Sequence, residues 1–340
     1  MKAAVLHKPL DLTVEEIQNP TIAEDEVLVM VKATGICGTD IHVYRGVFPN
    51  MRFPVVPGHE YAGQVAEVGS AVEQVREGDR VIGEGSWGCG KCHFCKGGQP
   101  NSCADLRRLG RTVDGAFAEY VKVPAKSTHV LHENINYEEA QSIMTLACIM
   151  HAMKRIKMEI GDTVAILGPG HVGLLFLQAL RGIADRTIVL GTRDDMSRLK
   201  LAANLGASAT IDVTSVDPIE RIRELTNGKG VDVAIEASGS PIAINHAVKM
   251  VKSAGQVLLF GTAEKPVEGF DAIRVQNEEL TIVGSRAGLG GYDAAISLLA
   301  SRRVSVADLI TNKFTLQDIG RAYETVDKRT EDYVRVIVTP

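Results

Sequence analysis

The stretch TVAILGPGHVG, residues 163–173, determines how the second half of this 340-residue chain folds. Five residues with the composition of a buried strand lead directly into a G-x-G-x-x-G turn, and a helical pattern follows. Glycines at this spacing permit a tight turn and let a pyrophosphate approach the helix N-terminus. A merely glycine-rich turn is the competing interpretation, but the flanking strand and helix favour a dinucleotide site. Its candidate contacts are Gly168, Gly170, His171, Val172 and Gly173.

Apolar runs of the same kind recur through the second half of the chain, at intervals of roughly 20 to 25 residues. Helical patterns lie between most of them. Alternation of strands and helices at this spacing predicts an α/β fold with a doubly wound, six-stranded parallel sheet. The predicted strands are residues 163–167, 187–190, 209–211, 231–235, 256–260 and 280–283.

The N-terminal part has a different pattern, because short strand-like runs alternate there with glycine and proline, as in a loop-rich β domain. The tail contains two helical patterns and a strand-like run at 333–339, which fall outside the six-strand count. We therefore assign residues 153–290 to a dinucleotide-binding domain. Residues 1–152 and 291–340 together form the second domain.

The composition excludes several classes of protein. With 45% hydrophobic and 23% charged residues, the chain is neither disordered, collagen-like nor a coiled coil. Its 37 basic residues are outnumbered by 42 acidic ones, and the net charge of −5 argues against a nucleic-acid partner. The longest apolar stretch, residues 172–180, is about half a membrane span, and no signal-peptide pattern opens the chain. We therefore expect a cytoplasmic protein without a membrane partner.

Four of the six cysteines form a compact motif, Cys89-x2-Cys92-x2-Cys95-x7-Cys103. Four thiolates in a lobe of residues 88–104 can complete a tetrahedral Zn²⁺ shell, and nearby glycines let the chain wrap tightly. Such a shell leaves no position open for water, so this zinc is expected to be structural. An iron–sulfur cluster or four unmetallated thiols are the alternatives, and nothing else in the sequence indicates electron transfer.

The residues after the second strand of the sheet bear on the choice of dinucleotide. An acidic residue there would accept a hydrogen bond from the ribose 2′-hydroxyl of NAD, whereas arginine suits the 2′-phosphate of NADP. Gly191 occupies the position expected for the acid, and Thr192 and Arg193 follow it. This pattern favours NADP, although Asp194 or Asp195 offers a carboxylate for NAD.

A third set of motifs lies in the first domain, where CGTDIH at residues 37–42 precedes PGHEYAG at residues 57–63. Cys37 and His59 offer a thiolate and an imidazole for zinc, with carboxylates nearby to orient them. A lone cysteine and a lone histidine are more often core or surface residues. The pattern alone therefore does not identify a catalytic metal site.

Over its whole length the chain resembles the zinc-containing medium-chain alcohol and polyol dehydrogenases. Residues 58–72 follow that family's zinc signature, G-H-E-x2-G-x5-G-x2-V, and the four-cysteine lobe has the family's spacing. Residues 37–42 are closest to its sorbitol and threonine dehydrogenase branch. The resemblance implies a GroES-like catalytic domain with a Rossmann domain, one structural and one catalytic Zn²⁺ per chain, and NAD or NADP as cofactor. It also implies a homo-oligomer, either a dimer or a tetramer.

The resemblance assigns roles to individual residues. Cys37 and His59 would bind the catalytic zinc, with Glu60 beside it, and Asp40 would hold the ring of His59. The residues implied for catalysis are thus Cys37 and His59 at the metal, Thr39 as hydrogen-bond partner of the substrate oxygen, and His42 to pass the proton to solvent. Further candidates are Ser238, Gly261 and Arg286 for the cofactor, each after a predicted strand, and Tyr44, Arg45 and Phe48 for the substrate pocket.

One position departs from the family's pattern. Its third zinc ligand, Cys, Glu or Asp, lies seven residues before the position of His151, where this chain has Met144. Zn²⁺ prefers thiolate, imidazole or carboxylate to a thioether, so Met144 is expected to pack in the core. Three alternatives remain, in order of preference. Glu60 is the third protein ligand, Cys148 reaches the metal from one helical turn further on, or the zinc is weakly bound or absent.

The expected function is zinc-dependent hydride transfer between NAD(P) and a small-molecule substrate with a secondary hydroxyl, such as a polyol, a sugar or a secondary alcohol. A second hypothesis is an L-threonine 3-dehydrogenase-like activity on an amino alcohol, although no unmistakable carboxylate-binding arginine marks it. A third, of another class, is a catalytically impaired nucleotide-binding redox sensor, in which Met144 has spoiled the metal site.

Overall fold

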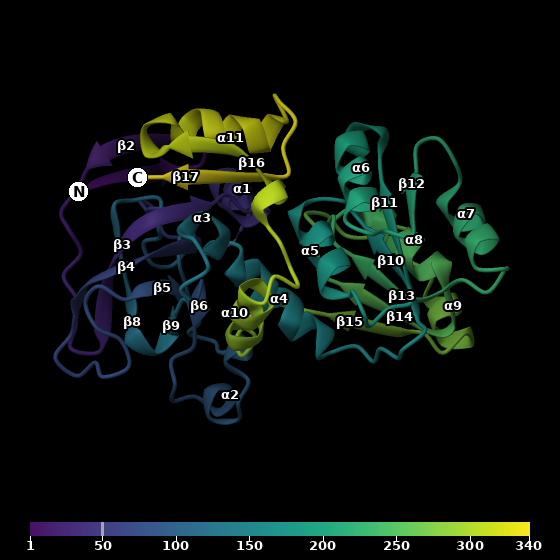
Figure 1. Cartoon of the computed structure of the whole chain (residues 1–340), viewed down its shortest axis with the longest axis horizontal. Helices are drawn as coiled ribbons and strands as arrows, with labels where there is room; N and C mark the ends of the chain where they lie inside the picture. Colours follow the sequence, from purple (N-terminus) through teal and green to yellow (C-terminus); the bar gives the residue numbers. More distant parts are fainter. Residues whose placement is uncertain (49–50) are drawn as a thin grey trace. The chain divides into compact units, whose positions relative to one another are not determined.

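The computed structural model describes residues 1–48 and 51–340, and it divides into two compact units. One comprises residues 1–148 and 287–340, and the other comprises residues 149–286. The boundaries expected near residues 152 and 290 lie within a few residues of these divisions. Within the first unit, the C-terminal elements, yellow in Figure 1, lie beside the N-terminal strands, which are purple.

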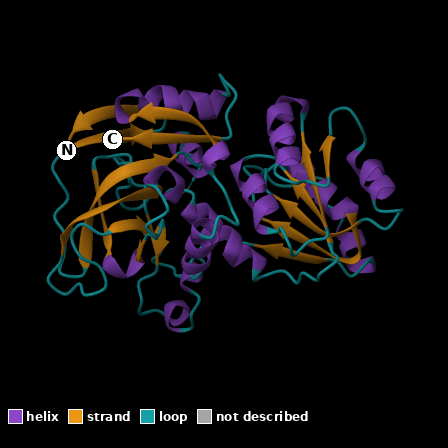
Figure 2. Cartoon of the chain, in the orientation of Figure 1, coloured by secondary structure: helices purple, strands orange, loops and turns teal. Residues whose placement is uncertain are grey.

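The unit of residues 149–286 is built on a six-stranded sheet of order β12-β11-β10-β13-β14-β15, and every neighbouring pair is parallel. Helices flank this sheet, as Figure 2 shows in purple against the orange strands. It is the predicted doubly wound α/β fold. Its elements are β10 (Thr163–Leu167), α5 (His171–Ala179), β11 (Arg186–Gly191), α6 (Met196–Asn204), β12 (Ala209–Asp212), α7 (Pro218–Leu225), β13 (Val231–Glu236), α8 (Pro241–Met250), β14 (Val251–Leu259), α9 (Ala272–Asn277) and β15 (Thr281–Gly284).

The central strands of this sheet are buried along almost their whole length, since all residues but one are buried in each of β10, β11 and β13. Helices cover both faces of a parallel sheet, so its strands have continuous apolar sequences, and these are the runs that the sequence shows. From β10 the chain builds outward to β11 and β12, then returns to add β13, β14 and β15 on the other side. Such a change of direction leaves a crevice at the carboxyl ends of the strands, where dinucleotides bind.

One strand is longer than the sequence predicts. The apolar run at residues 256–260 marks only its second half, because β14 begins at Val251, directly after α8. Val251 pairs with Val231, and the register then shifts before Gln256 pairs with Val233. Of the residues between, Lys252, Ser253 and Ala254 are exposed and the buried Gly255 has no side chain, so none of them contributes to a hydrophobic pattern that could mark a strand.

The other unit is centred on a mixed sheet of seven strands. Six follow the order β16-β17-β3-β4-β5-β9, and β8 pairs with β3. The unit also contains two separate two-stranded sheets, β1-β2 and β6-β7. Its elements are β1 (Lys2–Lys8), β2 (Asp11–Glu16), β3 (Glu26–Gly35), α1 (Gly38–Tyr44), β4 (Glu60–Val68), β5 (Arg80–Gly83), β6 (Ser86–Trp87), α2 (His93–Lys96), β7 (Arg107–Arg108), β8 (Tyr120–Pro124), β9 (Thr128–Val130), α3 (Tyr137–Ala140), α4 (Ile143–Met153, which runs on into the second unit), α10 (Tyr292–Ala300), β16 (Ile310–Thr315), α11 (Ile319–Lys328) and β17 (Arg335–Thr339). None of the helices described in either unit has the length and hydropathy needed to cross a bilayer.

The C-terminal strand joins this sheet next to the strand that leads into the predicted metal site. β17 pairs antiparallel with β3, where Ile337 lies opposite Gly35. The preceding helix, α11, packs Ile319 and Tyr323 into the same core as Ile41 of α1. The tail and the N-terminal residues therefore share one hydrophobic core.

Candidate active site and cofactor site

Three residues that can bind a metal converge at the starts of α1 and β4. Cys37 is the N-cap residue of α1, while His59 precedes β4 and Glu60 begins it. One ligand atom from each residue lies within 4.8 Å of those from the other two, and His59 and Glu60 are buried. A tetrahedral Zn²⁺ holds its ligand atoms roughly 3.3–3.8 Å apart, so a small contraction completes the shell. The group fits zinc in both donor chemistry and spacing.

The wholly buried carboxylate of Asp40 organises this group. One oxygen lies 3.0 Å from Nδ1 of His59 and accepts the N–H of Gly58 at 3.2 Å, and the other accepts the N–H of Cys37 at 2.9 Å. An ionised carboxylate can only accept hydrogen bonds, so the contact puts a proton on Nδ1 and leaves Nε2 as the ligating nitrogen. The three contacts fix the chain on both sides of the metal group.

Two opposing effects set the pKa of His59. Burial favours the neutral ring and by itself lowers the pKa, but the Asp40 carboxylate and the Cys37 thiolate stabilise the protonated ring. The net pKa lies well above the ordinary value for histidine. The same negative surroundings favour a divalent cation at this position.

A buried ion pair holds Glu60. One of its oxygens accepts a hydrogen bond from Oγ1 of Thr145 at 2.9 Å, and the other accepts from the guanidinium of Arg335. Nε of Arg335 also donates to the amide oxygen of Gln141 at 2.8 Å. Both charged side chains are only 3% exposed. This network keeps an ionised carboxylate next to the other two candidate ligands.

Met144, expected to pack in the core, is only partly buried and lies against Gly85. A Cβ added to Gly85 would lie 3.0 Å from Cε of Met144 and 3.2 Å from its Sδ, so the thioether lies against that glycine. Burial, together with the charges of Glu60 and Cys37, raises the pKa of the Cys148 thiol, which therefore lies in the neighbourhood of the site. Among the described residues, however, the group with mutually close ligand atoms contains Glu60 and not Cys148.

Thr39 and His42 lie three residues apart on α1, so their side chains are neighbours on this short helix. Both are partly exposed, and the His42 ring meets Phe48 edge-on, with ring centroids 5.7 Å apart. Tyr44 and Arg45, the other predicted pocket residues, are directed instead toward α11. Tyr44 forms an aromatic pair there, with ring centroids 5.3 Å apart, and Arg45 an ion pair at 2.6 Å.

The four cysteines of the lobe form a second group whose ligand atoms lie within 4.8 Å of one another. Sγ of Cys103 lies 3.8 Å from that of Cys92 and accepts the N–H of Cys89 at 3.4 Å. Backbone N–H groups lower the pKa of Cys89 to about 6, which favours its thiolate at neutral pH. A Cβ at Gly88 would lie 2.6 Å from Sγ of Cys95, so the close wrap of the chain requires glycine. This donor set fits a closed Zn²⁺ shell.

In the second unit, the predicted dinucleotide turn joins β10 to α5. Gly168 has a φ of 107°, and a Cβ there would lie 2.9 Å from Cβ of Ser238. A Cβ at Gly173 would lie 2.0 Å from the carbonyl oxygen of Gly168. At Gly170, the N-cap of α5, an added Cβ would meet no described atom within 4 Å. Space is thus open at the N-terminus of this helix, where a pyrophosphate can approach.

A buried carboxylate shapes the neighbouring turn after β13. Glu236 accepts hydrogen bonds from the N–H of Ser238 at 2.7 Å and from that of Gly239 at 2.9 Å. Gly261 lies against the same turn, because a Cβ there would be 2.2 Å from the nitrogen of Gly239. Two predicted cofactor contacts, Ser238 and Gly261, are thereby brought together beside Gly168.

The residues after β11 form the rim of a small cavity. The Asp195 carboxylate is committed elsewhere, since it is buried, accepts a hydrogen bond from Oγ1 of Thr192 at 2.9 Å and lies 3.2 Å from the Arg198 guanidinium. A Cβ at Gly191 would lie 2.7 Å from the Pro169 ring, so a larger residue would crowd the glycine turn. The cavity measures about 290 Å³ and is lined by Thr192, Arg193, Asp194 and Thr214.

The remaining predicted cofactor contacts are differently placed. His171 and Val172 are the first two residues of α5, and His171 is buried. Arg286 is exposed and follows β15 by two residues, at the end of the second unit.

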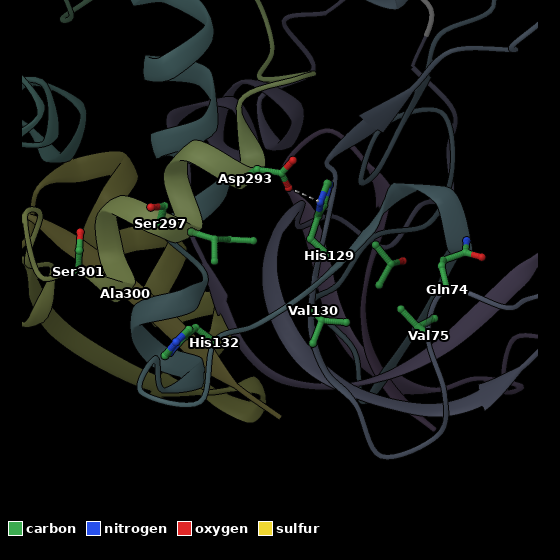
Figure 3. A pocket seen from close by; sticks show the side chains of 11 residues that line it. Gln74, Val75, His129, Val130, His132, Asp293, Ser297, Ala300 and Ser301 are labelled. Atoms are coloured by element: carbon green, nitrogen blue, oxygen red, sulfur yellow. Dashed lines mark ion pairs between the residues drawn. The ribbon is translucent and has the colours of Figure 1, made fainter.

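A larger cavity, of about 740 Å³, lies between β9 and α10, and Figure 3 shows its lining. His129 lies there, 3.2 Å from Glu84 and 3.7 Å from Asp293, and its ring stacks on Tyr292. None of the site residues predicted from the sequence is among the residues that line it. Cavity size alone therefore does not identify the site of chemistry in this chain.

Motif reasoning missed the residues that hold Glu60. Thr145 lies 85 positions from it and Arg335 lies 275 positions from it, so no local spacing connects them. The one available signal is that RVIVT, residues 335–339, places an arginine at the start of an apolar strand, where a buried charge requires a partner.

Known proteins match the chain over both units. The family described as "Alcohol dehydrogenase GroES-like domain" matches residues 23–133, and "Zinc-binding dehydrogenase" matches residues 172–301. Sorbitol dehydrogenase of Halalkalibacterium halodurans is 34% identical over 100% of this chain and 99% of its own length. D-arabitol-phosphate dehydrogenase of Enterococcus avium is 36% identical over 96% of this chain and 93% of its own length. A zinc-binding dehydrogenase of Sinorhizobium meliloti, solved with NADP bound, is 32% identical with a TM-score of 0.93, over 100% of this chain and 99% of that one.

A parallel nucleotide-binding sheet in one unit, with thiolate, imidazole and carboxylate donors gathered in the other, defines a metal-dependent oxidoreductase that uses a nicotinamide cofactor. Within that class, the chain belongs to the zinc-dependent medium-chain alcohol and polyol dehydrogenases. The predictions of family, fold class and enzyme class are confirmed.

Replacement of Arg335 by Met tests the network around Glu60. It leaves a carboxylate buried without its charged partner, so we expect the free energy of unfolding to fall by about 3–5 kcal/mol. The control, Arg221→Met, removes a half-exposed partner of Glu224 on α7 and is expected to cost less than about 0.5 kcal/mol. Urea unfolding followed by circular dichroism measures both variants. Similar losses in the two would contradict the role assigned to the buried pair.

Proposed function

We propose that this dehydrogenase transfers hydride between a nicotinamide dinucleotide and a secondary hydroxyl of a polyol, a sugar or a secondary alcohol. The observation that carries the proposal is the convergence of Cys37, His59 and Glu60, whose ligand atoms lie within 4.8 Å of one another beside a helix that bears Thr39 and His42. The open helix N-terminus after the glycine turn supports the dinucleotide.

Cys37, His59 and Glu60 are the residues that would hold the catalytic Zn²⁺. Bound there, Zn²⁺ supplies a Lewis acid that lowers the pKa of a substrate hydroxyl. Glu60 is the third protein ligand in this proposal, since Met144 offers a thioether that packs on a glycine and Cys148 lies outside the close group. The lobe cysteines would hold a second, structural zinc.

Thr39 and His42 move the proton in this proposal. The Thr39 hydroxyl forms a hydrogen bond with the substrate oxygen and relays its proton to the His42 imidazole, which is a suitable base near neutral pH. Their neighbouring positions on α1 support the relay, and the partial exposure of His42 supports release of the proton to solvent. Asp40 lies on the same helix but is buried and committed to three hydrogen bonds, so it orients His59 and is not the base.

We propose NADP as the preferred cofactor. Arg193 and Thr192 line the cavity after β11 and offer a guanidinium and a hydroxyl to a 2′-phosphate. Asp195 is buried and paired with Arg198, which removes one of the two carboxylates that could bind the ribose of NAD. Asp194 remains on the rim as the competing acceptor.

We also propose that the enzyme is a cytoplasmic homo-oligomer, a dimer or a tetramer, without nucleic-acid or membrane partners. The net charge of −5 supports the absence of a nucleic-acid partner. The oligomer rests on the resemblance to the family alone.

A substrate panel tests the proposed function. Polyols, sugars, simple secondary alcohols and L-threonine would each be offered with NAD⁺ and with NADP⁺, and reduced nicotinamide would be followed by its absorbance. We expect reduction with at least one polyol, sugar or secondary alcohol. Activity on L-threonine alone would support an amino-alcohol dehydrogenase, and no reduction with any substrate would contradict both.

Metal content separates the catalytic proposal from a redox sensor. We expect two zinc ions per wild-type chain, and one in Cys37→Ala or His59→Ala, with turnover lower by at least about 10³-fold because the Lewis acid is lost. Both variants are expected to bind NADPH normally, as measured by its fluorescence. Cys95→Ser is the matched thiol change and should remove the other zinc. Full activity in Cys37→Ala, or a single zinc in the wild type, would contradict the mechanism.

Arg193→Ala tests the cofactor proposal. Loss of the guanidinium is expected to raise KM for NADP⁺ by about 10- to 100-fold while leaving KM for NAD⁺ nearly unchanged, since only NADP⁺ carries the 2′-phosphate. The control, Arg223→Ala, removes an exposed guanidinium on α7 that pairs with Glu220. A wild type that prefers NAD⁺, with no change on removing Arg193, would assign the enzyme to NAD.

A further inference from the structure

The turn at residues 110–113 is held directly against the chain segment that carries His59. The N–H of Ala116 donates to the carbonyl of Gly58 at 2.9 Å. Gly110 has a φ of 72°, and a Cβ there would lie 2.8 Å from the nitrogen of Gly58. Gly110 therefore contacts the segment that carries His59, and residue 111 follows directly after this contact.

That residue is Arg111, and its side chain reaches back toward α1. Its guanidinium carbon lies 3.6 Å from the centroid of the Phe48 ring, and Phe48 meets the His42 imidazole edge-on, at 5.7 Å and 69°. A continuous set of contacts thus joins a permanent positive charge to the residue proposed to receive the substrate's proton. Arg111 and His42 thus contact the same ring, one at its face and the other at its edge.

The geometry of this stack suits anion recognition. A guanidinium that lies over an aromatic ring uses its flat face for the contact, and its N–H groups project from the edge of that plane. Those edges match the oxygens of a phosphate or a carboxylate, which they bind through paired hydrogen bonds. The ring also shields one face of the cation from water, which strengthens its attraction for an anion.

The charged side chains next to Arg111 form a pair of opposite sign, so they leave its positive charge uncompensated. The N–H of Arg52 donates to the carbonyl of Arg111 at 3.3 Å, so the two arginines are adjacent. The Arg52 guanidinium lies 4.0 Å from the Asp114 carboxylate, and both of those side chains are exposed. These three groups together carry one net positive charge.

We propose that Arg111, supported by Phe48, determines substrate specificity, and that the preferred substrate carries an anionic group, a phosphate or a carboxylate, at the end of the chain remote from the oxidised hydroxyl. The inference rests on the proposed function, because it takes the reacting hydroxyl to bind at Thr39, on the helix that also carries His42. Arg111 binds the substrate in this account and takes no part in the proton transfer.

The test compares D-glucitol, D-glucitol 6-phosphate and D-gluconate as substrates for the wild type, Arg111→Gln and Arg111→Lys. We expect the wild type to prefer one anionic substrate over D-glucitol by about tenfold or more in kcat/KM, and the preferred one tells phosphate from carboxylate. Arg111→Gln should remove that preference mainly by raising KM for the anionic substrate, with a much smaller change in kcat/KM for D-glucitol. Arg111→Lys keeps the positive charge but lacks the planar guanidinium, so it should retain part of the preference for the anionic substrate.

Arg76→Gln is the matched control, because it removes an exposed arginine of the same unit that pairs with Asp79. It is expected to leave all three kcat/KM values unchanged. Thermal unfolding and zinc content of Arg111→Gln check that its fold and metal are intact. A wild type indifferent to the anionic group, or equal losses on all three substrates in Arg111→Gln, would overturn the inference and reduce Arg111 to a packing partner of Phe48.

Binding separates this inference from the proposed function. Isothermal titration calorimetry with D-glucitol 6-phosphate, D-gluconate and inorganic phosphate needs no turnover. Tighter binding of an anion to the wild type than to Arg111→Gln would support Arg111 even if none of the substrates were oxidised, in which case the proposed function alone would fail. Equal binding to the two proteins would count against Arg111 whether or not polyols were oxidised.

Discussion

Between the start of α1 and the start of β4, the buried Asp40 carboxylate accepts hydrogen bonds from both segments. Each backbone N–H that it receives would cost roughly 1–3 kcal/mol if it were buried without a partner, so neither segment can move away cheaply. The same carboxylate sets the tautomer of His59 and so determines which ring nitrogen is available to a metal. One side chain therefore fixes the position of the thiol, the position of the imidazole and the chemistry of its ring.

Charge balance connects this carboxylate to the rest of the site. Cys37 as a thiolate, Asp40 and Glu60 bring three negative charges into a region where Arg335 is the buried positive partner. A divalent cation among them makes the sum neutral, which is the arrangement a low-dielectric interior favours. The raised pKa of His59 has the same origin, because the Asp40 carboxylate and the Cys37 thiolate attract a proton as they attract a metal. The distant Arg335 is thus part of the electrostatics of the site as well as of its packing.

The sequence predicts those features that are local or repeated. Strands buried on both faces appear as apolar runs, so the six-stranded sheet was predictable, except at the start of β14, where residues 252–254 are exposed. The spacing of the four lobe cysteines predicts one metal group, whereas the group of Cys37, His59 and Glu60 is implied by the resemblance to the family and not by the spacing alone. Arg335 and Thr145 were not predictable, since they meet Glu60 only through the tertiary fold. Tyr44 and Arg45 follow His42 in the sequence yet contact α11, because a helix turns successive side chains to different sides.

The pairing of β17 with β3 has a consequence for how the protein is made. Ile337 lies opposite Gly35, so nearly the whole chain must leave the ribosome before the sheet beside the metal group is complete. The nucleotide-binding unit, residues 149–286, has a core of its own and can fold while synthesis continues. Among the first 148 residues, β8 already pairs with Glu26–Met30 of β3, but the end of β3 at Thr34 and Gly35 remains unpaired on that side until β17 is made. Such an exposed strand edge is open to wrong pairing. β17 also delivers Arg335 to Glu60, so the charged network beside the metal group is complete only after residues 1–334 have been synthesised.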